Sequence, residues 1–165
     1  MIERNYILKP EYDGITHLNI YSKAKTMLGR MLNNFYYFPF KTIHGNFYSV
    51  EGLWHWLGIE ECDEKEILKF LYGYKARKIG LELKKKYKKN FDEKFEEKII
   101  KAIQYKIYKN LDMFTDDIKN LPFEHYYIFN GMIIDEREKN NWMITAIDKI
   151  RNDIINVEKR IIKKV

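Results

Sequence analysis

The sequence has few of the residues that cross-link, break or anchor a chain. Its 165 residues include one cysteine, Cys62, three prolines and eight glycines, and no stretch rich in serine, glycine and proline marks a linker. A single cysteine excludes an internal disulfide, and small secreted domains usually need several. No apolar run approaches the roughly 20 residues that span a bilayer, and the first residues lack the apolar core of a signal peptide. These absences predict one soluble, cytoplasmic domain with no membrane partner.

Several residue patterns that carry chemistry are also missing. The chain has no glycine-rich phosphate loop, no nucleophile elbow and no His/Cys cluster with the spacing of metal ligands. Its four histidines are scattered along the sequence: His17, His44, His55 and His125. We therefore expect neither a zinc site nor any other metal, and no pattern implies an organic cofactor.

Apolar and aromatic residues, by contrast, are abundant, and positive charge is in excess. The 45% of hydrophobic and 16% of aromatic residues suffice for one substantial core and argue against disorder. The formal net charge of +6 favours anionic partners such as nucleotides or nucleic acids. Five lysines of this excess are nearly consecutive: Lys84, Lys85, Lys86, Lys88 and Lys89. Such a run is either a solvated helix end or a contact to phosphate groups.

Two patterns predict extended segments in the first third of the chain. Apolar and polar residues alternate over residues 16–21, which is typical of a strand with one buried face. Residues 36–48 are expected to be extended and to be broken by a turn at His44-Gly45-Asn46.

Helices are expected to form most of the remaining chain. Ser49 can cap a helix that carries Leu53 and Trp54. Asp63 with Glu66 resembles the capping box of another helix, which should end near residue 72. Longer helices are predicted at about residues 74–88, 92–110 and 141–162.

The strongest local signal is the dipeptide Asn130-Gly131. It separates two β-prone runs, residues 125–129 and 132–135, and a type I′ hairpin turn needs positive φ at both of its central residues. Together these patterns predict an α+β fold: a predominantly helical single domain with a small β-sheet and a late Asn-Gly hairpin.

A polar and aromatic stretch from Tyr21 to Trp56 holds most of the residues that can carry chemistry. In order it contains Tyr21-Ser22, Asn33-Asn34-Phe35, Phe38-Pro39, Gly45 with Phe47, and Ser49-Val50-Glu51 with Trp54. Further along stand Ala76-Arg77-Lys78-Ile79-Gly80 and Asn141. In this order and spacing the chain resembles the NADAR family, the NAD- and ADP-ribose-associated domain, over nearly its whole length.

The chain departs from the family pattern at two places. Many members carry a Gln-x-x-Lys-Phe element after the Ser-x-Glu helix start, and here Gly58 stands in place of that lysine. Many also carry Trp-Gly-Asp before the last helix, where this chain has the Asn130-Gly131 hairpin running to Asp135.

The resemblance implies cleavage of N-glycosidic bonds. Family members act on ribosylamino intermediates of riboflavin synthesis or remove ADP-ribose from guanine bases in DNA. Such a reaction requires a group that protonates the leaving base and a group that stabilises positive charge at the anomeric carbon. A lysine can instead trap the opened sugar as a Schiff base if the pKa of its amine is depressed. The expected partner is an ADP-ribose-type nucleotide or an ADP-ribosylated nucleic acid.

The expected site follows from the matched positions. Glu51 is the candidate acid/base, Lys23 the first candidate amine and Lys25 the second. Candidate substrate contacts are Tyr21, Ser22, Arg30, Asn34, Trp54, Asp135 and Asn141. Each residue also has a plain structural interpretation: a carboxylate at the position of Glu51 offsets the helix dipole, and lysines are ordinarily solvated.

Two other classes of function remain open at this point. The domain can bind an ADP-ribose-type nucleotide without turnover, or it can be a basic nucleic-acid-binding protein in which the Tyr21–Trp56 stretch is incidental. The positive charge favours a nucleic-acid substrate over a small riboside.

Overall fold

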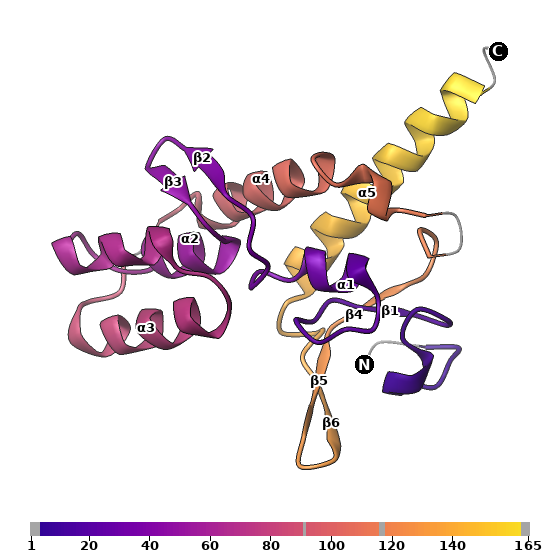
Figure 1. The fold of residues 1–165 in the computed structure, drawn as a ribbon, viewed down its shortest axis with the longest axis horizontal. Helices are drawn as coiled ribbons and strands as arrows, with labels where there is room; N and C mark the ends of the chain where they lie inside the picture. Colours follow the sequence, from indigo (N-terminus) through magenta and orange to yellow (C-terminus); the bar gives the residue numbers. More distant parts are fainter. Residues whose placement is uncertain (1–3, 91, 116–117, 163–165) are drawn as a thin grey trace.

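The computed structural model describes residues 4–90, 92–115 and 118–162, without the side chains of 157–162. Its α-helices are α1 (Met27–Leu32), α2 (Val50–Leu57), α3 (Gly73–Lys86), α4 (Phe95–Tyr108) and α5 (Asn141–Ile162) (Figure 1). Its 3₁₀ helices are η1 (Pro10–Tyr12), η2 (Asp63–Phe70) and η3 (Leu111–Met113). The last three predicted helices are thus present, with ends that differ by no more than a few residues.

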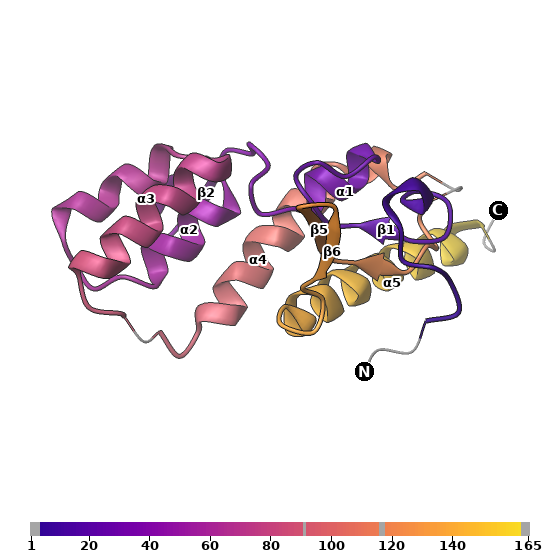
Figure 2. The same cartoon turned by 90° about the horizontal axis from the view of Figure 1, so that it is seen from below.

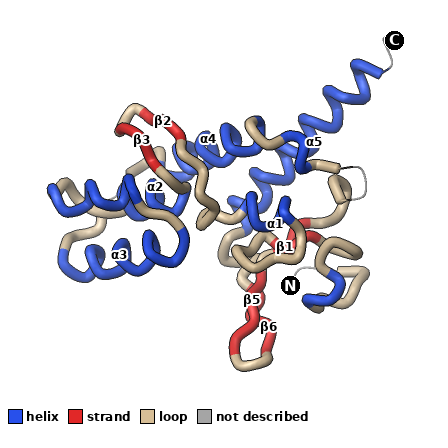
Figure 3. The backbone as a smooth tube through the Cα atoms, viewed as in Figure 1, coloured by secondary structure: helices blue, strands red, loops and turns tan. Residues whose placement is uncertain are grey.

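The strands form two-stranded sheets rather than one larger sheet. β1 (Leu18–Asn19) pairs in parallel with β4 (Phe123–Glu124), β2 (Phe40–Thr42) pairs antiparallel with β3 (Gly45–Phe47), and β5 (Tyr126–Phe129) pairs antiparallel with β6 (Met132–Asp135). Figure 3 shows how small these sheets are beside the helices. The predicted class, a helix-dominated α+β domain, is confirmed.

The first strand is shorter and more buried than the alternation over residues 16–21 predicted. Only Leu18–Asn19 are in β1, and every residue from His17 to Ile20 is buried. The polar face is buried because Asn19 pairs with the backbone of Tyr126 in both directions, at 3.0 Å for each hydrogen bond. A half-buried strand was therefore the wrong expectation for this segment.

The two predicted helix starts have different outcomes. The Ser49 cap is confirmed, because its Oγ accepts a hydrogen bond from the backbone N–H of Gly52 at 3.0 Å. The capping box at Asp63 is wrong: η2 begins after Cys62 without a side-chain cap, and it is a 3₁₀ helix. The Glu66 carboxylate instead accepts a hydrogen bond from Trp56 Nε1 at 2.7 Å, so it cannot reach back to the helix start.

The predicted hairpins are present. Asn130 has φ 48° and Gly131 has φ 75°, so both central residues have the positive φ of a type I′ turn. The turn between β2 and β3 lies at residues 43–44, one residue earlier than predicted, and Gly45 opens β3 with φ 111°.

A single hydrophobic core connects the elements. Figure 2 shows α4 between α2, α3 and β2 on one side and α1, β1, β5, β6 and α5 on the other. Leu53 of α2, Ile103 of α4 and Ile147 of α5 belong to the same buried cluster. Each such side chain contributes about 1.5–3 kcal/mol relative to leaving it exposed. In the part of the chain that the structure describes, no helix is both long and apolar enough to cross a membrane.

Candidate functional site

Helix α2 aligns four positions of interest on one face. Glu51, Trp54, His55 and Gly58 follow one another at the i, i+3, i+4 and i+7 spacing that brings helical side chains together. Ser49 fixes the start of this helix, so Glu51 lies in its first turn, where the helix dipole favours a carboxylate.

The carboxylate of Glu51 is largely enclosed and is held by a histidine. Glu51 is only 9% exposed, and its Oε1 lies 3.1 Å from Nε2 of His55. His55 in turn packs directly against α3 at Gly80, where a Cβ atom would lie 2.1 Å from Cγ of the imidazole ring. The glycine at position 80 therefore makes room for the Glu51–His55 pair between the two helices.

Lys84, one turn after Gly80 on α3, brings an amine to the same place. Its Nζ lies 3.1 Å from where a Cβ of Gly58 would be. Burial lowers the pKa of Lys84, and the nearby Glu51 carboxylate acts in the opposite direction. We call Glu51, His55 and Lys84 the Glu51 cluster: a carboxylate, an imidazole and an amine between α2 and α3.

The Asn33-Asn34 segment is held beside this cluster from two directions. The backbone N–H of Glu51 donates to the carbonyl of Asn34 at 3.0 Å. From α4, Nζ of Lys106 donates to the carbonyl oxygens of Leu32 at 3.3 Å and Asn33 at 3.0 Å. Lys106 is fully buried, and this burial lowers the pKa of its amine to about 7. Its two carbonyl partners accept hydrogen bonds from the amine whether the amine is neutral or protonated.

The side chain of Asn34 is only partly satisfied. Its Nδ2 contacts Sδ of Met143 at 3.6 Å, and its buried Oδ1 has no hydrogen-bond partner among the described residues. An amide oxygen in this position can accept a hydrogen bond from a bound ligand.

Two indole rings stack at the junction between α2 and α5. The rings of Trp54 and Trp142 have centroids 5.8 Å apart and planes 17° from parallel, and Phe95 packs edge-on against Trp54 at 4.9 Å. Both tryptophans are only partly buried. Asn141, the first residue of α5, is exposed next to this stack.

Other predicted site residues line a separate cavity of about 230 Å³. Tyr21, Lys23 and Lys25 contribute to its lining, together with Tyr126 and Tyr127. Lys23 is exposed, whereas Lys25 Nζ donates to the carbonyl of Glu11 at 2.9 Å. Ser22 lies half-buried in the same loop.

Arg30 and Asp135 have structural partners. The Arg30 guanidinium donates to the carbonyl oxygens of Ala24 at 2.7 Å and Lys25 at 3.2 Å, so it fixes the loop before α1. Asp135 accepts a hydrogen bond from Arg4 at 2.7 Å. The structure therefore joins the backbones of Glu51 and Asn34, with Trp54 one turn further along α2 and Asn141 next to its stacking partner Trp142. The lining of the cavity with Tyr21, Lys23 and Lys25 does not include them.

Sequence reasoning overlooked His55, Lys84 and Lys106. The i, i+4 spacing of Glu51 and His55 was a usable signal. Lys84 was not singled out because it belongs to the lysine run, whose members have different surroundings in the fold. Lys84 is half-buried, Lys86 pairs with Glu64 at 2.5 Å, and the other three lysines are exposed.

A buried carboxylate outside the cluster, Glu124, was also overlooked. It is fully buried in β4, and Arg4 donates two hydrogen bonds to it at 2.7 Å. Tyr6 and Arg137 also donate to this carboxylate. The Glu124 network raises the pKa of Arg4 and, together with burial, that of Tyr6. With all its partners supplied by the chain, Glu124 joins the N-terminal segment to β4.

Comparison of the chain with protein-family models, curated proteins and solved structures returned no match. The resemblance to the NADAR family thus rests on the sequence elements given above.

Proposed function

We propose that the protein is an N-glycosidase that hydrolyses the bond between an ADP-ribosyl or ribosyl group and a base, with ADP-ribosylated guanine in DNA as the preferred substrate. The observation that supports this most is the Glu51–His55 pair, an enclosed carboxylate hydrogen-bonded to an imidazole at the start of a helix. Such a pair can pass a proton to the leaving base, and the carboxylate can stabilise the charge that develops at the anomeric carbon.

Lys84 can supply the amine that this sequence lacks at the family's lysine position. Many members have a lysine at the position of Gly58, and here the amine of Lys84 lies beside Gly58 from the neighbouring helix. Its pKa is lowered by burial, which raises the fraction of the neutral, nucleophilic form. We therefore place Lys84 ahead of Lys23, which is exposed in the separate cavity.

The covalent step can be written in full. The neutral amine of Lys84 adds to the anomeric carbon as the bond to the base breaks, and the base leaves with a proton from the Glu51–His55 pair. The resulting ammonium group passes one proton to the ring oxygen as the bond between that oxygen and the anomeric carbon breaks, which opens the ribose to a protonated Schiff base. Water adds to the imine carbon and returns a proton to the Glu51–His55 pair, and elimination of the amine then releases the sugar as its aldehyde and regenerates neutral Lys84.

The neighbouring groups suit the other parts of such a substrate. The Asn34 Oδ1 can accept a hydrogen bond from a ribose hydroxyl. The partly buried Trp54–Trp142 pair offers aromatic surface on which a base can stack. The net charge of +6 attracts a nucleic acid, and the single cysteine supports a cytoplasmic location.

The test is incubation of the protein with ADP-ribosylated DNA oligonucleotides and, in parallel, with free ribosylated bases. Release of ADP-ribose or ribose supports the enzyme. Tight binding of ADP-ribose without release indicates a binding module instead, and DNA binding alone indicates a nucleic-acid-binding protein. A variant with Glu51→Gln keeps the side-chain shape, so it separates catalysis from binding.

A further inference from the structure

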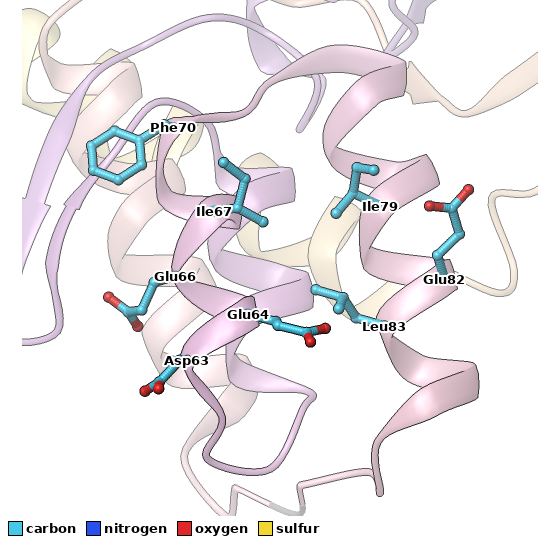
Figure 4. A pocket seen from close by; sticks show the side chains of 8 residues that line it. All are labelled: Asp63, Glu64, Glu66, Ile67, Phe70, Ile79, Glu82 and Leu83. Atoms are coloured by element: carbon cyan, nitrogen blue, oxygen red, sulfur yellow. The ribbon is translucent and has the colours of Figure 1, made fainter.

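A groove of about 550 Å³ lies between η2 and α3, lined by residues other than the Glu51 cluster. Figure 4 shows Ile67 of η2 and Ile79 of α3 on facing sides of this groove, with Leu83 further along α3. Ile67 is 50% exposed, and Phe70, one turn further on η2, is 57% exposed. Exposed apolar side chains gathered in a groove are typical of an interaction surface.

Every charged residue that lines the groove is acidic. Its lining contains four carboxylates and no lysine or arginine: Asp63, Glu64, Glu66 and Glu82. Lys86 pairs with Glu64 at 2.5 Å and Lys69 with Glu66 at 2.5 Å. Within the described ranges, Asp63 and Glu82 have no ion pair. Two carboxylates at the groove, Asp63 and Glu82, are therefore left to face a basic ligand, on a chain whose net charge is +6.

We propose that this groove binds an amphipathic helix of a partner protein, whose apolar face lies on Ile67, Ile79 and Leu83 and whose flanking lysines or arginines face the carboxylates. A channel between two helices is a shape into which a third helix fits, with apolar anchors at i, i+3, i+4 and i+7. The acidic rim selects a cationic helix and rejects nucleic acid, whose phosphates it repels. The inference does not depend on the N-glycosidase activity.

The probe is a fluorescein-labelled helical peptide of 14 residues, the length of α3, with leucines on one face and lysines beside them. Two control peptides match it, one with every lysine replaced by glutamate and one with the same composition in scrambled order. Fluorescence anisotropy should show binding of the first peptide only, with an affinity that falls as salt is added.

Variants of the protein locate the binding site. Ile67→Ser, and separately Asp63→Lys with Glu82→Lys, should each weaken binding of the peptide by about tenfold or more. The matched control, Glu93→Lys with Glu96→Lys, makes the same change in charge at exposed positions outside the groove and should leave the affinity within about twofold. Thermal melting checks that all variants are folded.

Three results would overturn the proposal. One is equal binding of the glutamate or scrambled peptide, and another is full affinity in the groove variants. The third is a dimer, detected by sedimentation, that the Asp63→Lys/Glu82→Lys variant disrupts, because the occupant is then a second copy of this chain.

Discussion

The amine of Lys84 lies beside Gly58: a Cβ atom at position 58 would be 3.1 Å from Lys84 Nζ and 3.2 Å from its Cε. One residue is on α3 and the other ends α2, so the fold brings an amine to a position where the local sequence has none. The Schiff-base route of the proposed function relies on this relationship.

We therefore predict that borohydride added during turnover traps a covalent adduct between protein and sugar, and that Lys84→Ala abolishes it. Lys23→Ala should leave the adduct intact. In the Lys84→Ala background, Gly58→Lys should restore part of the adduct, because it supplies an amine at the adjoining position. Peptide mapping by mass spectrometry identifies the modified residue. An adduct on Lys23 contradicts the assignment to the Glu51 cluster.

A second prediction concerns the packing of His55 on α3. Gly80→Ala places a methyl group 2.1 Å from His55 Cγ, so the imidazole must move or the helices must separate. We expect a loss of about 1–3 kcal/mol in the free energy of unfolding, together with reduced turnover. Urea denaturation measures the first effect. Gly58→Ala is the matched control, because the added methyl meets mainly the flexible end of Lys84, and it should change stability by less than about 1 kcal/mol.

Lys106 gives a prediction about pH. Its pKa is about 7 in the folded protein and ordinarily 10.5, so between these values the unfolded chain binds one proton more than the folded chain. The free energy of unfolding should therefore rise with pH across this range, by up to about 1.4 kcal/mol per pH unit from this group. Below pH 7 both states are protonated and this contribution to the slope disappears.

The comparison with Lys106→Met isolates that contribution, because methionine is of similar length and does not titrate. Urea denaturation at several pH values from 7 to 10 should show the wild type gaining stability relative to the variant. If the free energies of unfolding of the wild type and the variant change in parallel with pH, the Lys106 amine keeps its ordinary pKa inside the protein.

The hairpin turn gives a prediction independent of function. Gly131 has φ 75°, a conformation that a β-branched residue adopts only with strain. We expect Gly131→Val to lower the free energy of unfolding by about 1–2 kcal/mol. Gly131→Asn is the control, since asparagine tolerates positive φ, and it should lose clearly less. Equal losses in the two variants would show that the turn conformation is not what the glycine provides.

Local signals in the sequence were enough to predict the helices α2, α3, α4 and α5, the Ser49 cap and the Asn130-Gly131 hairpin, but not the short helix α1. Each depends on residues within one turn or one hairpin of each other. The pairing of β1 with β4 was not predictable, because Leu18 and Phe123 are far apart in the chain and no local pattern relates them. The capping box at Asp63 failed because a distant side chain, Trp56, engages the Glu66 carboxylate.

The same distinction between local signals and long-range contacts explains which residues of the candidate site could be predicted. Glu51, Asn34 and Trp54 were expected from the sequence, and the structure brings them together around the start of α2. Lys84 joins them only because Gly80 lets α3 approach α2 closely, a tertiary effect that a run of lysines does not reveal. Arg30 was expected to contact the substrate, but it donates to backbone carbonyls close to it in the sequence, which residue type alone does not show.

The most direct test of the account is the rate at which the protein releases ADP-ribose from an ADP-ribosylated guanine oligonucleotide, compared between the wild type and Glu51→Gln. If Glu51 acts as the acid/base, the variant should bind the oligonucleotide with unchanged affinity and release ADP-ribose about 10²–10⁴ times more slowly. Release by Glu51→Gln at the rate of the wild type would contradict the account.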